Sequence, residues 1–270
     1  EDADESFRRI VTVECRPEAA PESETLPLRI AAEREHPCVA FSHQQVAQIR
    51  KRLGTDGAAK RNFEATILST ADGWDGLYKD DTWESFKMPE FGSQHRTIGR
   101  AAYACAAAYV ITGEDIYAQK AAAIFRKYAD PKTGYVSYKF PGYWATRLFH
   151  QNYMGQTGWV DEFIRAHDWL AGADLLSDEE KLQIEWYVLF AAAHDYWNEG
   201  YRGPNDGNAT TMFVDASSAM GAVLNDPWFL DDAIDGPLGY RHLVGNSVLD
   251  GGFWYEGSWS YHSLSRNYLT

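Results

Sequence analysis

Three glycine-containing segments, residues 143–159, 202–210 and 250–262, combine aromatic rings with amide, basic and acidic side chains. Aromatic rings can cover the apolar faces of pyranose sugars, while amide and charged groups bind hydroxyls and carboxylates. The three segments are therefore candidates for a site that binds a sugar chain. The alternative is that their aromatic side chains belong to the core. The candidate site residues are Arg147, His150, Gln156, Trp159, Arg202, Asn208, Trp254, Tyr261 and His262.

Pairs of helices are expected to position these segments. Apolar residues recur at spacings of three and four in residues 99–128, 158–198 and 210–249, and each range predicts two helices. The junctions are expected at residues 112–114, 176–180 and 225–227. Strand patterns are nearly absent, so the predicted fold is all-α, either a solenoid or a closed α/α toroid. The sequence has no repeat of fixed period, which favours an incomplete toroid of antiparallel helix hairpins.

The N-terminal part of the chain differs from the rest. Residues 1–35 contain one short β-like run, Arg9–Cys15, followed by a Pro-, Glu- and Ser-rich stretch that predicts a linker. The helical domain is expected to cover residues 36–270. Its first helix should begin at a capping box formed by Ser42 and Gln45 and should end at Gly54.

Composition and charge exclude several classes of protein. The chain has 270 residues, of which 45% are hydrophobic and 14% aromatic, which excludes disorder for most of its length. There are 25 Lys and Arg against 39 Asp and Glu, a net charge of −14, so the basic footprint of a nucleic-acid binder is missing. No apolar run approaches the roughly 20 residues of a membrane span.

The cysteines and the first residues of the chain carry little functional information. Cys105 lies in an apolar helical stretch and is expected to be a buried, inert thiol. Cys15 and Cys38 could pair in an oxidising compartment. No cysteine or histidine spacing matches a zinc site, so neither metal nor cofactor is expected. The acidic start EDADESFRRI is no signal peptide, although a processed mature form would look the same.

Three stretches of the chain resemble heparinase II/III-like polysaccharide lyases. HPCVAFSHQQVAQIRKRL is similar to the first helix of that family, and QTGWVDEFIRAHDWLAGADLLSDEE resembles its segment with a functional Gln. The most specific stretch, DGGFWYEGSWSYHSLSRNYL, resembles the family's D-G-x-W-x-E-G…Y-H segment, whose Tyr is catalytic. The separations of 52 residues between Gln156 and Asn208 and of 53 between Asn208 and Tyr261 lie close to those of the family. The resemblance covers roughly residues 36–270.

The resemblance implies β-elimination at a uronic acid within an acidic polysaccharide, by a secreted or periplasmic enzyme. Tyr261 would remove the proton at C5 and protonate the leaving oxygen, and Asn208 would neutralise the C5 carboxylate with help from Gln156. The cations that could favour the phenolate are Arg147, His150, Arg202 and His262. Trp159 and Trp254 would contact the sugar.

Two features of the chain depart from the family pattern. Many members carry His directly after the neutralising Asn, whereas this chain has Ala209. Either this subgroup works without that His, or the chain is an inactivated variant, or the assigned register is wrong. Family members also continue into further toroid helices and a β-sandwich, so we expect the chain, which stops at Thr270, to be a fragment or one piece of a larger assembly.

Two other functions remain open at this point. An α/α-toroid glycoside hydrolase would need two carboxylates on either side of the scissile bond, with Asp206, Asp250 and Glu256 as candidates. Glu256 is expected instead to orient its loop by bonding backbone amides. The third possibility is a non-catalytic polysaccharide-binding or scaffold protein.

Overall fold

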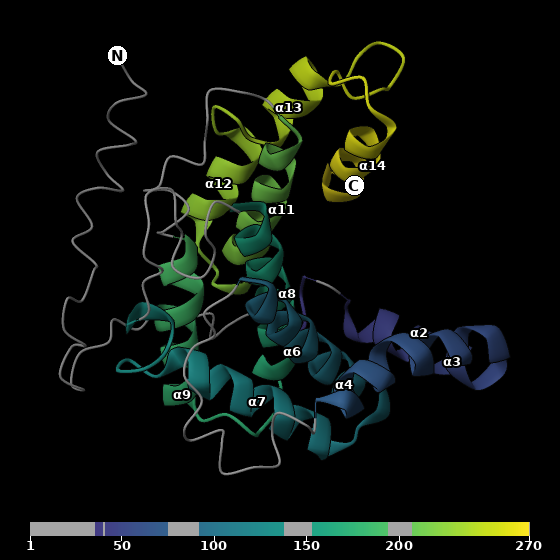
Figure 1. Ribbon diagram of the computed structural model, residues 1–270, viewed down its shortest axis with the longest axis vertical. Coiled ribbons are helices and arrows are strands. Elements are labelled where there is room, and N and C mark those ends of the chain that lie inside the picture. Colours follow the sequence, from purple (N-terminus) through teal and green to yellow (C-terminus); the bar gives the residue numbers. More distant parts are fainter. Residues whose placement is uncertain (1–35, 40, 75–91, 138–152, 194–206, 270) are drawn as a thin grey trace.

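The computed structural model describes residues 36–39, 41–74, 92–137, 153–193 and 207–269 (Figure 1). Helices dominate these residues, and strands are absent from them apart from an isolated antiparallel bridge between Val248 and Trp254. The all-α prediction is confirmed. In the same residues, no helix combines the length and the apolar character needed to cross a membrane.

The domain begins with an arm of short helices that projects to the right in Figure 1. The arm consists of α2 (His43–Thr55), α3 (Gly57–Phe63), the π-helix η1 (Glu64–Leu68) and α4 (Ser69–Gly73). The predicted capping box of Ser42 and Gln45 is present. The predicted end at Gly54 is wrong, because α2 continues to Thr55. Asp56 separates the helices, since its Oδ1 accepts hydrogen bonds from the backbone N–H groups of Ala58 and Ala59 at 2.9 and 3.0 Å and thereby begins α3.

The first two predicted hairpins are confirmed. The first pairs α6 (Gly92–Thr112) with α7 (Asp115–Ala129), and Gly113 makes the turn with a φ of 78°. The short 3₁₀-helix η3 (Tyr135–Ser137) follows. In the second hairpin, α8 (Tyr153–Ala171) is followed by α9 (Asp178–Ile184), which continues as the π-helix η4 (Glu185–Phe190). The expected capping box of Ser177 and Glu180 begins α9.

The third hairpin has the predicted break but one more helix than expected. It comprises α11 (Asn208–Val223), α12 (Pro227–Asp235) and α13 (Tyr240–Ser247), and α14 (Trp259–Leu269) follows after a loop. The break between α12 and α13 falls at Gly236–Gly239. A Cβ at Gly236 would lie only 2.2 Å from the carbonyl oxygen of Asp232, so the tight turn there depends on glycine.

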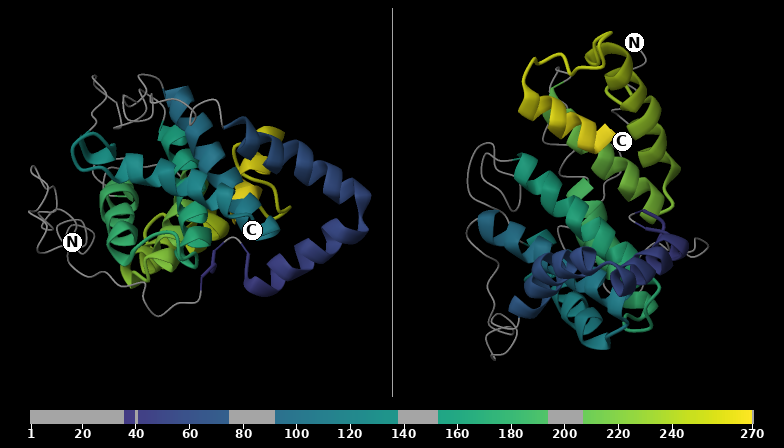
Figure 2. Two further views of the ribbon diagram at one scale, coloured as in Figure 1. Left: turned by 90° about the horizontal axis from the view of Figure 1, so that it is seen from below. Right: turned by 90° about the vertical axis from the view of Figure 1, so that its right-hand side faces the viewer.

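Four helices form a row that runs through the molecule. α6 packs on α8, α8 on α11 and α11 on α14, and α6, α8 and α14 lie one above another in the right-hand view of Figure 2. Contacts advance along both members of each pair. Gly99 of α6 faces Trp159 of α8, and further along Tyr103 packs against Trp169. Arg165 of α8 binds Asp215 of α11, and Sγ of Cys38, beside Asp168, lies 3.9 Å from the carbonyl oxygen of Ala222. Glu256, just before α14, binds the N–H of Asn208 at the start of α11, whereas Leu269 at the end of α14 packs in the cluster of Val214. Neighbouring helices of the row therefore run in the same direction, and α7, α9 and α12 return the chain between them.

The core of the row is built from small residues on one helix and large rings on its neighbours. α6 contributes a run of buried alanines and Cys105, which is fully buried as predicted. Against it pack the rings of Tyr128, Trp159 and Phe163, with Trp159 and Phe163 separated by 4.3 Å between ring centroids. Small side chains let the helices approach, while the rings supply most of the buried apolar area.

Two helical glycines provide a matched test of this packing. A Cβ at Gly221 in α11 would lie 2.7 Å from Leu230 Cγ and 2.8 Å from the Leu230 nitrogen in α12, whereas one at Gly245 in α13 meets nothing within 4 Å. Gly221→Ala should therefore lower the free energy of unfolding by about 1–3 kcal/mol through overpacking. Gly245→Ala should raise it by up to about 1 kcal/mol through helix propensity. Urea unfolding measures both, and equal effects would contradict the α11–α12 packing.

Candidate functional site

One carboxylate oxygen joins two of the three segments that the sequence singled out. Oε2 of Glu256 accepts a hydrogen bond from the backbone N–H of Asn208 at 2.8 Å and another from the indole Nε1 of Trp254 at 2.7 Å. Asn208 is the first residue of α11, where backbone N–H groups lack partners within the helix and the helix dipole favours negative charge. The prediction that Glu256 orients its loop by bonding a backbone amide is confirmed.

The loop between α13 and α14 is held by further bonds of its own. The backbone N–H of Trp254 donates to Nδ1 of His262 at 3.3 Å, and the Trp254 ring packs between α11, α12 and α13 against Val214, Ala233 and Leu243. His262 also stacks on Phe253, with 4.5 Å between ring centroids. The loop is therefore fixed on both sides of Glu256, and the first turn of α14 is fixed with it.

The two predicted catalytic residues lie at the starts of neighbouring helices. Asn208 is half-buried at the beginning of α11, and Tyr261, 45% exposed, lies in the first turn of α14. Gln156 belongs to the first turn of α8, but its side chain lies outside the described residues. The separations of 52 and 53 residues thus correspond to one step along the row of helices. Gly207 is the N-cap of α11, and Asn208 is its first helical residue.

Two of the predicted sugar contacts are corrected by burial. Trp159 is 0% exposed and Trp254 is 2% exposed, so neither ring offers a face to a polysaccharide. Trp159 stacks on Tyr135 within the core, and Trp254 anchors the loop. Aromatic surface near Tyr261 comes instead from Tyr255 and Trp259.

Of the remaining candidate residues, the structure describes some, and others lie outside the described part of the chain. Of the predicted cations, His262 is half-buried, and because its Nδ1 accepts a hydrogen bond, Nε2 is the ring nitrogen open to a ligand. The alternative carboxylate Asp250 is exposed on the loop. The candidates that lie outside the described residues are Cys15, Arg147, His150, Arg202 and Asp206.

Sequence reasoning missed a charged network in the row of helices. Nε of Arg165 donates to both oxygens of Asp161 at 2.9 and 3.0 Å, and its Nη2 reaches Asp215 on α11 at 3.1 Å. Nearby on α8, Glu162 lies 3.7 Å from Nε of Arg100 on α6. The spacing of Asp161 and Arg165 by four residues, and the single acid in the apolar stretch around Asp215, were the available signals.

Burial changes the protonation of this network. Desolvation raises the pKa of Glu162 to about 7, despite the opposing charge of Arg100. Desolvation together with the neighbouring Asp161 raises the pKa of Asp215 to about 6, against the effect of Arg165. Both carboxyl groups thus hold their protons more tightly than an exposed acid.

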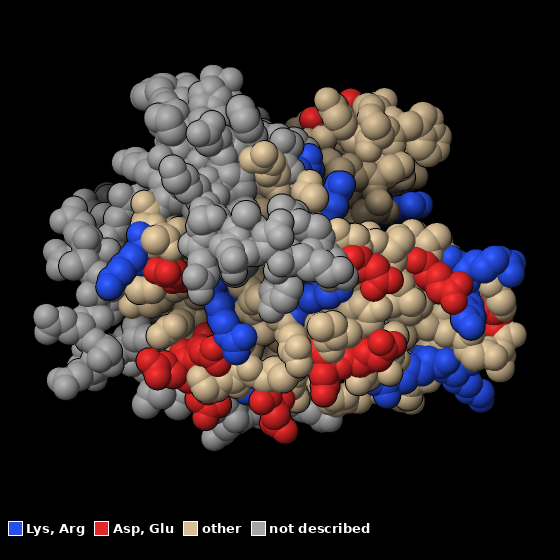
Figure 3. Space-filling model, turned by 60° about the horizontal axis from the view of Figure 1, so that its bottom comes forward, with Lys and Arg blue, Asp and Glu red and all other residues tan. Residues whose placement is uncertain are grey.

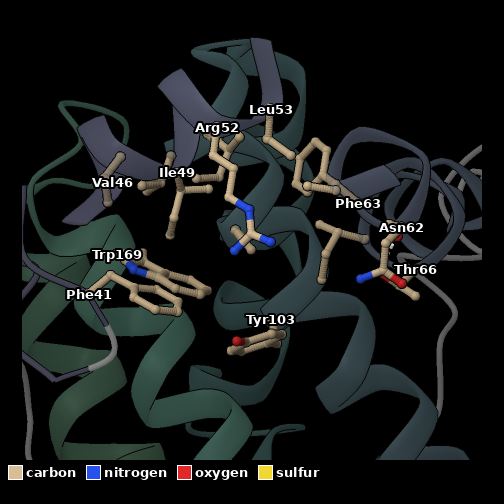
Figure 4. Close-up of a pocket in the computed structure, with 15 residues that line it drawn as sticks. Phe41, Val46, Ile49, Arg52, Leu53, Asn62, Phe63, Thr66, Tyr103 and Trp169 are labelled. Atoms are coloured by element: carbon tan, nitrogen blue, oxygen red, sulfur yellow. Dashed lines mark hydrogen bonds between the residues drawn. The ribbon is translucent and has the colours of Figure 1, made fainter. Parts of the chain in front are cut away.

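A cavity of about 450 Å³ lies elsewhere, between the arm and the helices α6 and α8 (Figure 4). Phe41 and Trp169 stack at one side of it with 6.1 Å between ring centroids, Arg52 points into it from α2, and Tyr103 lies opposite. Most other lining residues are apolar. Within the described part of the chain, no predicted site residue lines this cavity, so it is separate from Asn208, Tyr261 and His262.

The outer surface carries charges of both signs. Figure 3 shows acidic and basic side chains interspersed over the lower face, with basic ones gathered over the arm. The arm helices carry Arg50, Lys51, Arg52, Lys60 and Arg61. This local excess of positive charge contrasts with the net charge of −14 of the chain.

The carboxylate bridge leads to a first prediction for this site. Glu256→Ala removes the acceptor of Asn208 N–H and of the Trp254 indole, and we expect a loss of about 1–2 kcal/mol in the free energy of unfolding. Amide hydrogen exchange at Asn208 should accelerate. Asp250→Ala, an exposed acid in the same loop, is the control and should change neither quantity. Equal rates of amide hydrogen exchange at Asn208 in the two variants would rule out the hydrogen bond from Asn208 to Glu256.

The raised pKa of Glu162 leads to a prediction about pH. A carboxyl group whose pKa rises on folding contributes stability at low pH, below its unfolded value near 4.3, and loses that contribution as the pH rises through about 7. Gln imitates the protonated acid. Glu162→Gln should therefore raise the thermal midpoint relative to the unmodified chain at pH 8, and the gain should shrink toward pH 5.

Glu180 supplies a control for which the opposite change in thermal midpoint is expected at pH 8. Its hydrogen bond from Arg126 lowers the pKa of this carboxyl below the usual range, so Glu180→Gln should lower the thermal midpoint at pH 8. That loss should persist at pH 5 and fade only at lower pH. A Glu162→Gln variant that loses stability at pH 8 would show that the charged form is favoured in the fold.

No protein-family model matches the chain, and no curated protein matches its sequence. The functional conclusion therefore depends on the residues and the geometry described above.

Proposed function

We propose that this chain carries part of the site of a polysaccharide lyase that cleaves a uronate-containing polymer by β-elimination. The observation that carries the proposal is the bridge through Glu256, which joins the start of α11 to the loop that leads into α14. Asn208 and Tyr261 thereby belong to the starts of adjacent helices that run in the same direction. A row of such helices, in which α6, α8 and α11 are each followed by a helix that returns the chain, is the arrangement expected of an incomplete α/α toroid.

Asn208 supplies the neutralising group in this proposal. The proton at C5 of a uronic acid lies next to a carboxylate, and its removal places further negative charge on that group. A hydrogen-bond donor that is fixed before the reaction stabilises the developing charge, and comparable donors contribute about 2.7–4 kcal/mol to transition-state stabilisation. The position of Asn208 in the backbone is fixed by Glu256, and Gln156, one step away on α8, would donate to the same carboxylate.

Tyr261 supplies the base and then the acid. The phenolate takes the C5 proton, the C5–H electron pair becomes the C4–C5 double bond, and the bond from C4 to the glycosidic oxygen breaks. The same proton then passes to the leaving oxygen, so the protein returns to its starting state. Tyr261 is 45% exposed, which leaves the phenol accessible to a polymer. Because position 209 is alanine, no imidazole follows Asn208, and Tyr261 must perform both proton transfers.

Cationic groups would favour the phenolate form of Tyr261. His262 follows it directly in the chain and has Nε2 open to a ligand. Arg147, His150 and Arg202 remain the proposed further cations, drawn from the segments that precede α8 and α11. An acidic polymer supplies the complementary charge, and a secreted or periplasmic location would bring the enzyme to such a polymer.

The experiment that tests this function is a spectrophotometric assay on a panel of uronate polymers such as alginate, heparosan and glucuronan. The unsaturated product absorbs in the near ultraviolet. Tyr261→Phe should lower its rate of formation by at least about 100-fold, because proton transfer is lost, while polymer binding stays within about two-fold. Tyr255→Phe, a change at an exposed tyrosine of the same loop, is the control and should keep the rate.

The reaction class is tested separately by the origin of the product oxygen. In water enriched in ¹⁸O, elimination gives fragments without added ¹⁸O, whereas hydrolysis places one ¹⁸O atom in each cleaved bond. Normal turnover by Tyr261→Phe would reject Tyr261 as the base. Incorporation of ¹⁸O would reject elimination in favour of a hydrolase, and retention of polymer without cleavage would identify a binding protein.

A further inference from the structure

A second group of reactive side chains lies where the domain begins. His36 and Cys38 precede the arm, and Asp168 lies on α8, 130 residues further along the chain than Cys38. Nδ1 of His36 lies 2.6 Å from Oδ1 of Asp168, and Sγ of Cys38 lies 3.5 Å from that oxygen and 4.0 Å from that nitrogen. One nitrogen, one sulfur and one oxygen donor thus surround a common point.

We propose that His36, Cys38 and Asp168 form a binding site for a divalent transition metal of the zinc class. The three donor atoms lie within 4.8 Å of one another, so one ion can contact all three at about the 2.0–2.3 Å that Zn²⁺ takes from nitrogen, oxygen and sulfur ligands. For tetrahedral coordination the ion would replace the hydrogen bond between His36 Nδ1 and Asp168 Oδ1 and widen their 2.6 Å separation to about 3.3 Å. A thiolate and a carboxylate together balance the charge of a divalent ion. Mixed nitrogen and sulfur donors favour zinc over magnesium or calcium, which prefer oxygen ligands. This site is independent of the proposed lyase function.

The surroundings of Asp168 match those of a metal-ligating carboxylate. The side chain is completely buried, and its Oδ2 accepts hydrogen bonds from the backbone N–H groups of Cys38 and Val39, each at 2.8 Å. Such outer hydrogen bonds fix the orientation of a ligand.

The other two ligands leave an approach for the ion. Cys38 is exposed, and the side chain of His36 is 11% exposed, so solvent reaches the group from their side. A water molecule can complete the tetrahedron as the fourth ligand. Binding requires the His36 tautomer with its proton on Nε2, together with the thiolate of Cys38, whose proton passes to solvent.

The position of this group indicates a structural role for the metal. Asp168 and Gln156 are 12 residues apart on α8, which corresponds to about 18 Å along the helix. The group is thus remote from the helix starts that carry Asn208 and Tyr261. A bound ion would fasten the segment before the arm to the central row of helices.

Titration of the full chain with Co²⁺, a spectroscopic substitute for Zn²⁺, tests the proposal, with the thiols kept reduced so that Cys15 does not pair with Cys38. We expect one equivalent to bind with a sulfur-to-cobalt charge-transfer band in the near ultraviolet and visible bands typical of tetrahedral cobalt. Cys38→Ser should abolish the charge-transfer band and weaken Zn²⁺ binding by at least about 100-fold in competition with a chelator. Cys15→Ser, the same change at another cysteine, should bind as the unmodified chain does.

Thermal unfolding shows whether a loss of metal binding in Cys38→Ser is caused by a folding defect of that variant. The backbone donors to Asp168 do not depend on the Cys38 side chain, so Cys38→Ser should unfold at the same temperature as the unmodified chain when a chelator is present. Added Zn²⁺ should raise the midpoint of the unmodified chain and of Cys15→Ser, but not that of Cys38→Ser. Absence of a charge-transfer band, or equal Zn²⁺ affinity in the two serine variants, would overturn the proposal.

Discussion

The shared oxygen of Glu256 is the interaction on which the arrangement of the candidate site depends. It accepts hydrogen bonds from the first backbone amide of α11 and from an indole that is buried among α11, α12 and α13. Each donor would otherwise lie partly buried without this acceptor, and an unsatisfied buried donor costs about 1–3 kcal/mol. The positive end of α11 also favours the carboxylate charge. One carboxylate side chain thus determines how the loop before α14 packs on the start of α11.

The row of helices explains why residues far apart in the sequence have related positions. Each of α6, α8 and α11 is followed by a helix that returns the chain, so successive members of the row begin at the same end. Gln156, Asn208 and Tyr261 each fall in the first turn of such a helix. A separation of 52 or 53 residues is the length of chain needed for one outward helix, one return and their connections. The three proposed site residues are therefore separated by the length of one helix pair.

Local signals predicted the helices well, because capping and periodicity act over a few residues. The boxes at Ser42 and Ser177 and the breaks at Gly113 and Asn225 are such signals, and all four are present. The predicted end of α2, at Gly54, is one residue too early. The boundary between α2 and α3 is set instead by Asp56, whose side chain caps the start of α3.

Tertiary information was harder to obtain from the sequence. The pattern of aromatic residues does not reveal which rings face solvent, and Trp159 and Trp254 proved to be buried while Trp259 is 75% exposed. The network around Arg165 and the group of Asp168 with His36 and Cys38 combine residues from different helices or from distant parts of the chain. No spacing rule within one segment contains that information.

The central claim is that the start of α11 and the first turn of α14 present one surface to a single uronate ring. A crystal structure of the Tyr261→Phe chain with a uronate oligosaccharide tests it most directly. The account predicts a sugar carboxylate within hydrogen-bonding distance of the Asn208 side-chain amide, with C5 of the same ring facing position 261. An oligosaccharide bound elsewhere on the chain would contradict it. So would a structure in which the side chains of Asn208 and of residue 261 point to opposite sides of the row of helices.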